Sequence, residues 1–382
     1  MPLTKVTGPT LNTRPHFAIL DGLRGIAAIA VVIYHFMEIA VPDYHQSFIA
    51  HAHLAVDFFF CLSGFVIAYA YDHKLKQLGL ALFMKLRLIR LHPLVIIGSV
   101  IGLLVFVYDP FSNLYQAYAD RTPLMFITSC LMIPYPLVHE RYFNLFHLNP
   151  PTWSLFWEYI ANMVYALVLI RLRNKAMWAL VGIAAVAICY ESFHAGSLAV
   201  GWGGDNIVGG GIRVAYSFLA GILVYRSNWV IKSRLGFLSI GLFLIAVFVI
   251  PFSEKTNAVV DILLVLFYFP FLIALGAGAQ LKKRFSKICK WSGEISYPLY
   301  VIHYPFIWLF MSYVEQTKPN MQQMSGMIIF GVLALITLAY GILVFVDIPI
   351  RNYLKKVWIK DSPRKTEKSV VVFSVGREPI DS

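Results

Sequence analysis

Arg24 and His35 stand out in the first long apolar stretch of the chain, LDGLRGIAAIAVVIYHF at residues 20–36. Because a helix turns about 100° per residue, positions eleven apart return to within roughly 20°, so one helix face would carry both side chains. A guanidinium can hold an anion, and an imidazole can exchange protons with a hydroxyl near neutral pH. Ionisable residues inside a membrane span are costly and are often functional. The alternative is that neither residue is functional, with the arginine reaching the membrane surface and the histidine hydrogen-bonded to a neighbouring helix.

Three further apolar segments each carry an ionisable side chain: Asp57 in AVDFFFCLSGFVI, Glu158 in WSLFWEY and His303 in YVIHYPF. Together with His35 these make four titratable groups, and placing them around a shared interior cavity costs less free energy than exposing each one separately to lipid. We expect Asp57 to accept a hydrogen bond from His35 and fix its tautomer, which leaves the other ring nitrogen free to take a proton from a hydroxyl. Alternatively, Asp57 favours a helix dipole, Glu158 caps a helix and His303 only packs.

A cationic group, Lys85, Arg87 and Arg90, precedes the third apolar segment in FMKLRLIRLHPL. Arg87 and Arg90 are three residues apart, and two neighbouring guanidinium groups suit a phosphate-rich ligand, although lipid headgroups would suit them too. Ser63 precedes Gly64 in the second span, where the two small residues would allow close helix approach. Since no Gly-x-Ser-x-Gly motif is present, a serine hydrolase has little support.

The elements that must position these side chains are membrane helices. Hydrophobic residues make up 59% of the chain, charged residues 14%, and the mean hydropathy is +0.69. We therefore predict an all-α fold, a polytopic membrane bundle of about ten transmembrane helices, with a short re-entrant or outer helix within 123–138. The expected spans are 19–40, 53–72, 92–108, 153–171, 176–192, 211–226, 236–252, 258–280, 294–314 and 324–347.

The distribution of basic residues predicts the orientation. Most of the 32 Lys and Arg residues fall in segments on one side, which by the positive-inside rule is the cytoplasm and holds both termini. The segments on the other side hold only Arg121, Arg141, Lys255 and Lys318. The net charge of +12 therefore reflects topology and contact with anionic membrane lipids, not nucleic-acid binding.

The chain divides into three parts on this basis. Residues 1–18 form a cytoplasmic segment, 19–350 the transmembrane domain, and 351–382 a basic cytoplasmic tail that we expect to be disordered. The four cysteines lack metal-ligand spacing, so no metal site is expected.

Six motifs in order resemble those of the membrane-bound acyltransferase family 3, the integral-membrane O-acyltransferases, over about residues 17–350. They are LDGLRGIAAIAVVIYHF with Arg24 and His35, AVDFFFCLSGFVI, RLIRLHPL with Arg87 and Arg90, WSLFWEY with Trp153 and Glu158, IRVAYSFLAGILVYR with Arg213, and GEISYPLYVIHYPF with His303. The resemblance implies an acyl-CoA donor, usually acetyl-CoA, and a hydroxyl acceptor on a polysaccharide, a lipid-linked glycan or a small molecule.

The resulting hypothesis is an O-acyltransferase of the bacterial inner membrane. His35, Asp57 and Arg24 would form the catalytic centre, with His35 as a general base or a transient acyl carrier. The acyl-CoA site would comprise Arg87, Arg90, Lys85 and Ser63. The acceptor side would comprise Glu158, Arg213, His303 and Trp153. The alternative is a proton-coupled transporter or flippase for a glycan or lipid, which shares the buried charges but has no need of a coenzyme A clamp.

Overall fold

The computed structural model describes residues 17–360, which form a helical bundle without strands, so the predicted all-α class is confirmed. The α-helices are α1 (Ala18–Ala40), α2 (Ala55–Tyr71), α3 (Leu75–Leu78), α4 (Leu80–Val107), α5 (Leu114–Tyr118), α6 (Thr122–Leu131), α7 (Thr152–Leu167), α8 (Asn174–Ala195), α9 (Ile207–Arg226), α10 (Phe237–Phe248), α11 (Asn257–Leu263), α12 (Phe269–Gly278), α13 (Lys283–Ile302), α14 (Tyr304–Thr317), α15 (Met321–Ile342) and α16 (Ile348–Lys360). Short 3-10 or π turns are η1 (Tyr44–Gln46), η2 (Ala52–Leu54), η3 (His139–Arg141), η4 (Leu169–Arg171), η5 (Leu264–Tyr268) and η6 (Leu343–Asp347).

Eight helical stretches within 17–360 are long and apolar enough to cross a membrane. The two other predicted spans are also helical, but α10 is short and the ninth span divides into α13 and α14. This division has a local cause, since Pro305 has no N–H for the Val301 carbonyl and its ring crowds that oxygen. The regular helix consequently stops at Ile302, and His303 lies at the break.

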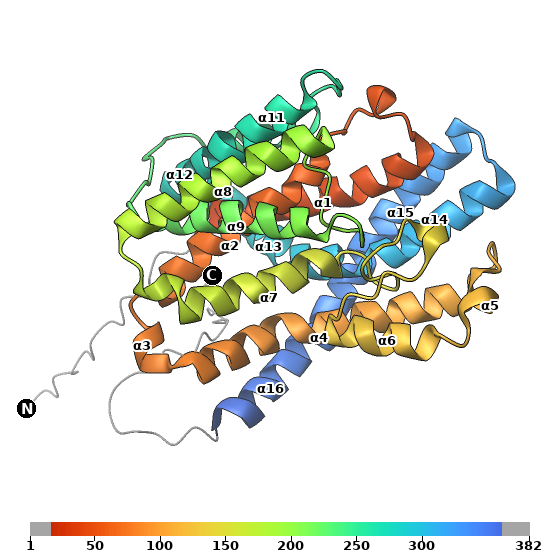
Figure 1. The fold of residues 1–382 in the computed structure, drawn as a ribbon, viewed down its shortest axis with the longest axis horizontal. Coiled ribbons are helices and arrows are strands. Elements are labelled where there is room, and N and C mark those ends of the chain that lie inside the picture. Colours follow the sequence, from red (N-terminus) through yellow and green to blue (C-terminus); the bar gives the residue numbers. More distant parts are fainter. Residues whose placement is uncertain (1–16, 361–382) are drawn as a thin grey trace, which may run out of the picture.

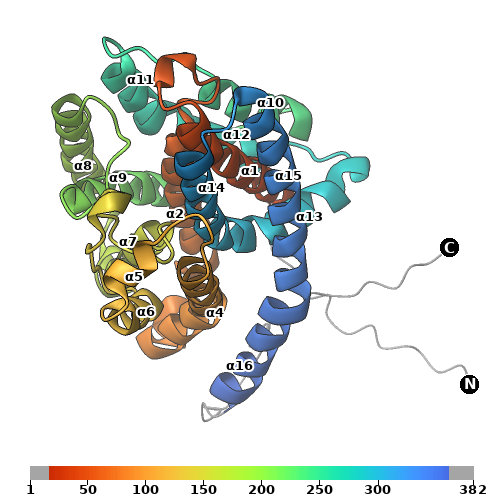
Figure 2. The same cartoon turned by 90° about the vertical axis from the view of Figure 1, so that its right-hand side faces the viewer.

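Most of the long helices run roughly along one axis (Figure 1). We call one end of the bundle the α3 end, where α1, α4 and α13 begin, and the opposite end the α5 end, where α2, α7 and α9 begin. Seen along that axis, α1 and α2 lie in the middle, with α8, α9 and α11 to one side and α15 to the other (Figure 2). The helix that carries Arg24 and His35 is therefore the core of the bundle.

Small residues set the two tightest helix pairs. A Cβ on Gly64 of α2 would collide with the Phe218 carbonyl of α9, and one on Gly221 would collide with the Cys61 carbonyl. These contacts agree with the predicted role of the Ser63–Gly64 pair in close helix approach. Gly25 of α1 lies equally close to α13. Without a Cβ at such positions, two backbones approach closely enough for polar side chains to bridge them.

In three segments the structure corrects or adds detail to the helix boundaries predicted from the sequence. The third span begins at Leu80 instead of 92, so Lys85, Arg87 and Arg90 lie on α4 itself. A helix, α6, occupies part of 123–138 and lies beside α4 toward the α5 end (Figure 1). Residues 351–360 belong to α16, so the expected disorder of that part of the tail is wrong. The remainder of the tail and nearly all of the predicted N-terminal segment lie outside the described residues.

Candidate active site

His35 lies near the α5 end of α1, and its partner is Glu38 instead of Asp57. The His35 Nδ1 and Glu38 Oε2 atoms are 2.6 Å apart, and the two side chains are 22% and 24% exposed. Because the carboxylate can only accept, Nδ1 donates and the lone pair falls on Nε2. No hydrogen bond among the described residues engages Nε2. The pair therefore presents a free, oriented proton acceptor.

Tyrosines hold the other side of the Glu38 carboxylate. The Tyr44 hydroxyl donates to Glu38 Oε1 at 2.8 Å and lies 3.3 Å from the Tyr34 hydroxyl. Burial, and then the Glu38 charge, raise the pKa of Tyr44, which remains a neutral donor. Our sequence analysis missed Glu38, although its position three residues after His35 places it on the same helix face.

Rings from the break between α13 and α14 cover His35. The His303 ring stacks on the His35 ring with centroids 5.4 Å apart, and Tyr304 meets His35 edge-on at 4.7 Å. His303 Nδ1 donates to the Tyr300 carbonyl at 2.7 Å, so Nε2 carries its lone pair. That Nε2 is buried and has no hydrogen-bond partner. The sequence prediction that His303 belongs near His35 agrees with this geometry.

Asp57 is engaged elsewhere, so the expectation that it orients His35 is wrong. Arg213 Nη2 donates to Asp57 Oδ2 at 2.6 Å, and the two side chains are 2% and 0% exposed. Arg213 also donates to the Val200 and His53 carbonyls, and its guanidinium lies 5.4 Å from the Trp153 ring centroid. In this enclosed ion pair every guanidinium nitrogen and both carboxylate oxygens make hydrogen bonds, and the pair joins α2 to α9.

Glu158 and Arg87 were expected to contact different substrates, but they form one ion pair. Arg87 Nη2 donates to Glu158 Oε1 at 2.7 Å, and the Ser63 hydroxyl donates to the same oxygen at 3.0 Å. Glu158 therefore lies with the cationic group and not on a separate acceptor side. Arg90, in contrast, is exposed, as is Lys85. The three cations of α4 thus differ in availability, because a carboxylate already neutralises Arg87, whereas Lys85 and Arg90 are exposed.

Arg24 joins α1 to α13. Its Nη2 donates to the Gly293 carbonyl at 2.6 Å and its Nε donates to the Ser296 hydroxyl at 2.9 Å. Asp21 lies 3.5 Å away, and the charges of Arg90 and Glu158 also reach Arg24. The Arg24 side chain is 26% exposed. The Arg24 side chain is therefore anchored to α13 and still partly exposed.

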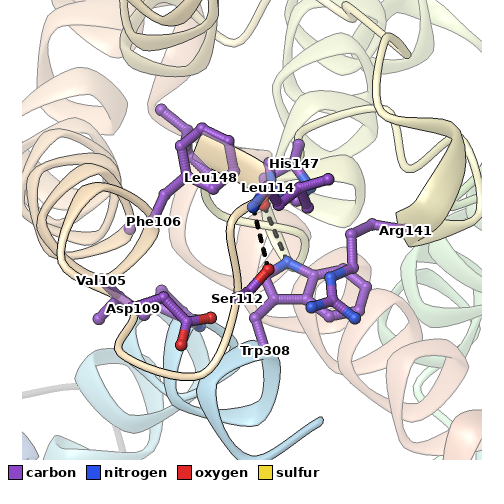
Figure 3. A pocket seen from close by; sticks show the side chains of 11 residues that line it. Val105, Phe106, Asp109, Ser112, Leu114, Arg141, His147, Leu148 and Trp308 are labelled. Carbon is purple, nitrogen blue, oxygen red and sulfur yellow. Dashed lines mark hydrogen bonds between the residues drawn. The ribbon is translucent and has the colours of Figure 1, made fainter. Parts of the chain in front are cut away.

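A small pocket adjoins the far side of α14, between α4 and the loop before α7 (Figure 3). Trp308 lines it and meets Tyr304 edge-on with ring centroids 4.9 Å apart, and Tyr304 in turn contacts the His35 ring. Arg141 and His147 line it as well, and the His147 Nδ1 atom is buried without a partner. Burial, with a lesser contribution from the Arg141 charge, lowers the pKa of His147 to about 3, so this imidazole is neutral.

Comparison with known proteins identifies the family of this chain. A family model for acyltransferase 3, described as an acyltransferase domain, matches residues 17–346. "Protein 2 in picA locus" of Rhizobium radiobacter is 36% identical over 161 residues, which are 39% of this chain and 81% of that protein. No solved structure matches the chain. The chain belongs to the acyltransferase 3 family and is a multi-pass membrane acyltransferase.

Proposed function

We propose that the chain is an O-acyltransferase that moves an acetyl group from acetyl-CoA to a hydroxyl of a surface polysaccharide, a lipid-linked glycan or a small molecule. The protein would lie in the bacterial inner membrane, with both termini and the α3 end facing the cytoplasm. The observation that carries this proposal is the His35–Glu38 pair, an accessible imidazole with one nitrogen held by a carboxylate and the other free.

In the proposed reaction, His35 Nε2 removes the proton of the acceptor hydroxyl as its oxygen attacks the thioester carbonyl. The carbon–sulfur bond then breaks, and the imidazolium returns the proton to the leaving coenzyme A sulfur. Glu38 would hold the tautomer that makes Nε2 basic and would stabilise the imidazolium once it forms. Tyr44 keeps that carboxylate in place by donating to its second oxygen.

The two substrates would approach His35 from opposite ends. Acyl-CoA would enter at the α3 end, where Arg90 is exposed and Arg24 is accessible. About 16 Å separates Arg24 from His35 along α1, at a rise of about 1.5 Å per residue. The acceptor would reach His35 from the α5 end, beside His303, whose unpartnered Nε2 can accept a hydrogen bond from a hydroxyl.

Membrane vesicles that expose the α3 end, prepared from cells that make the acceptor, test the proposal. Radiolabelled acetyl-CoA supplied to these vesicles should label a glycan, glycolipid or metabolite only when the protein is present. Mass spectrometry of the same fractions should then find an acetyl ester on the labelled species. An identical set of acetylated products with and without the protein would contradict the proposed reaction.

Thermal stabilisation of the purified protein by acetyl-CoA provides an independent test of the donor. We expect a dose-dependent rise in melting temperature with acetyl-CoA, because a ligand that binds only the folded state stabilises it. A melting temperature that does not respond at any acetyl-CoA concentration would contradict the choice of donor.

A further inference from the structure

Helix α16 lies beyond the region that matches the acyltransferase family, yet it packs against α4. The π turn η6 leads into it, and the helix crosses α4 toward the α3 end (Figure 1). Its exposed apolar side chains include Tyr353, Val357 and Trp358. One face of α16 therefore points outward and carries exposed aromatic side chains. Another face packs against α4, the helix that carries the arginines and lysine predicted to bind coenzyme A.

The inward face of α16 is basic. Arg351 and Lys355 are four residues apart, so they lie on one side of the helix, and both are only partly exposed. Lys356, the next residue, is exposed. Helix α16 packs against α4, and Arg90 of α4 is near enough for its charge to act on Lys355 and Asp347, so Arg90, Arg351 and Lys355 share one seam between the helices. We call these three residues the α4–α16 seam.

The three cations of the seam outnumber the carboxylates that pair with them. Arg351 pairs with buried Asp347 at 2.6 Å, but the Nε atom of Arg351 is buried without a partner. Neither Arg90 nor Lys355 has a carboxylate within ion-pair distance among residues 17–360. Arg87, the other member of the predicted arginine pair, is occupied by Glu158. Positive charge without a carboxylate partner therefore lies at Arg90 and Lys355, whereas Arg87 and Arg351 are each paired and each keep one buried Nε without a partner.

We propose that the α4–α16 seam, with Arg90, Lys355 and Arg351, binds the phosphates of the nucleotide half of the acyl-CoA donor. This inference rests on the proposed function. Phosphate oxygens would satisfy the donors left over at the seam, and guanidinium groups suit them geometrically. The position also fits the route, because the Arg90 charge reaches Arg24 on α1, whose opposite end carries His35. Phosphates of anionic lipid headgroups are the competing source of the same chemistry.

Matched variants of two adjacent lysines test the seam. Isothermal titration of the full-length protein would measure the Kd of acetyl-CoA and of S-acetyl-pantetheine, which has the same acyl arm without phosphates. We expect Lys355→Ala to weaken acetyl-CoA binding about tenfold or more, since charge-assisted hydrogen bonds are lost, and to leave S-acetyl-pantetheine unchanged. Lys355→Arg should retain most of the affinity. Lys356→Ala, which removes an equal charge from the outward face, should change neither ligand.

Several results would overturn the seam while leaving the proposed function intact. Wild-type binding of acetyl-CoA that Lys355→Ala does not weaken would place the phosphates elsewhere, and equal losses in both lysine variants would indicate only a general charge effect. If phosphatidylglycerol stabilises the wild type but not Lys355→Ala, with acetyl-CoA affinity equal in both, the seam is a lipid site. Absence of acetyl-CoA binding by the wild type would instead contradict the donor itself.

Discussion

Two pairs of ionisable side chains near the α5 end, His35–Glu38 and Asp57–Arg213, differ in exposure and in whether they have a hydrogen-bonding atom free for a substrate. In the His35–Glu38 pair both side chains are about a quarter exposed, and His35 Nε2 is free. In the Asp57–Arg213 pair both are enclosed, and carbonyls and the Trp153 ring take up the remaining capacity of the guanidinium. Both pairs lie on membrane helices of one family domain, and both could be taken for catalytic residues by charge alone.

The difference between these pairs separates chemistry from architecture. A buried ion pair in which every nitrogen and oxygen is already hydrogen-bonded has little left to offer a substrate, and removing one partner leaves an uncompensated charge. A partly exposed imidazole with one nitrogen fixed can still exchange a proton. We therefore assign the reaction to His35–Glu38 and the joining of α2 to α9 to Asp57–Arg213.

The largest effect is expected from His35→Ala. Loss of the proton acceptor should reduce acetyl transfer by about 10³-fold or more, while acetyl-CoA still binds at the other end of α1. The measurement is label transfer in vesicles together with the Kd of acetyl-CoA. His45→Ala, which removes an exposed histidine outside the pair, is the control and should transfer normally. Transfer at the wild-type rate by His35→Ala would exclude a catalytic role for this imidazole.

Asp57→Ala should act on stability instead of chemistry. Leaving Arg213 buried without its carboxylate should cost about 3–5 kcal/mol, seen as a low yield and a lower melting temperature in detergent. The double variant Asp57→Leu/Arg213→Met should recover much of the loss, because the pair is then replaced by apolar groups. If Asp57→Ala melts like the wild type but fails to transfer, Asp57 takes part in the reaction.

Glu38→Gln should slow transfer by about 10²-fold without weakening acetyl-CoA. The amide keeps the shape of the carboxylate but no longer stabilises the imidazolium, and the donor cations lie at the opposite end of α1. Initial rates over a range of acetyl-CoA concentrations separate kcat from KM. A rise in KM with kcat unchanged would mean that Glu38 binds a substrate instead of orienting His35.

Tyr44→Phe should have the smallest effect, a loss of a few-fold in kcat. It removes one hydrogen bond to Glu38, while Tyr34 still adjoins the carboxylate. Tyr118→Phe is a matched control, because the Tyr118 hydroxyl also donates to a carboxylate at 2.8 Å, that of Glu140, in a contact that includes neither His35 nor Glu38. Equal losses in the two tyrosine variants would remove Tyr44 from the account.

The sequence predicted the helical segments well, because apolar runs of sufficient length have few alternatives in a membrane. Every expected span is largely helical, although the ninth divides into α13 and α14. The sequence also singled out His35 and His303, whose rings the structure brings together. The sequence did not predict the hydrogen-bond and ion-pair partners correctly, because these depend on which helices become neighbours in the fold. Asp57 was matched to His35 by chemical type, yet the glycine contacts of α2 with α9 bring Arg213 to it. Glu38 was overlooked although local spacing alone could have indicated it.

The most direct test compares two isosteric variants, Glu38→Gln and Asp57→Asn, in one assay. Transfer rates would be measured in vesicles and divided by the number of acetyl-CoA binding sites, so that misfolded protein does not count. The account predicts that Glu38→Gln transfers about 10²-fold more slowly than the wild type and that Asp57→Asn transfers within about threefold of it. The reverse order, with Asp57→Asn crippled and Glu38→Gln near normal, would contradict it.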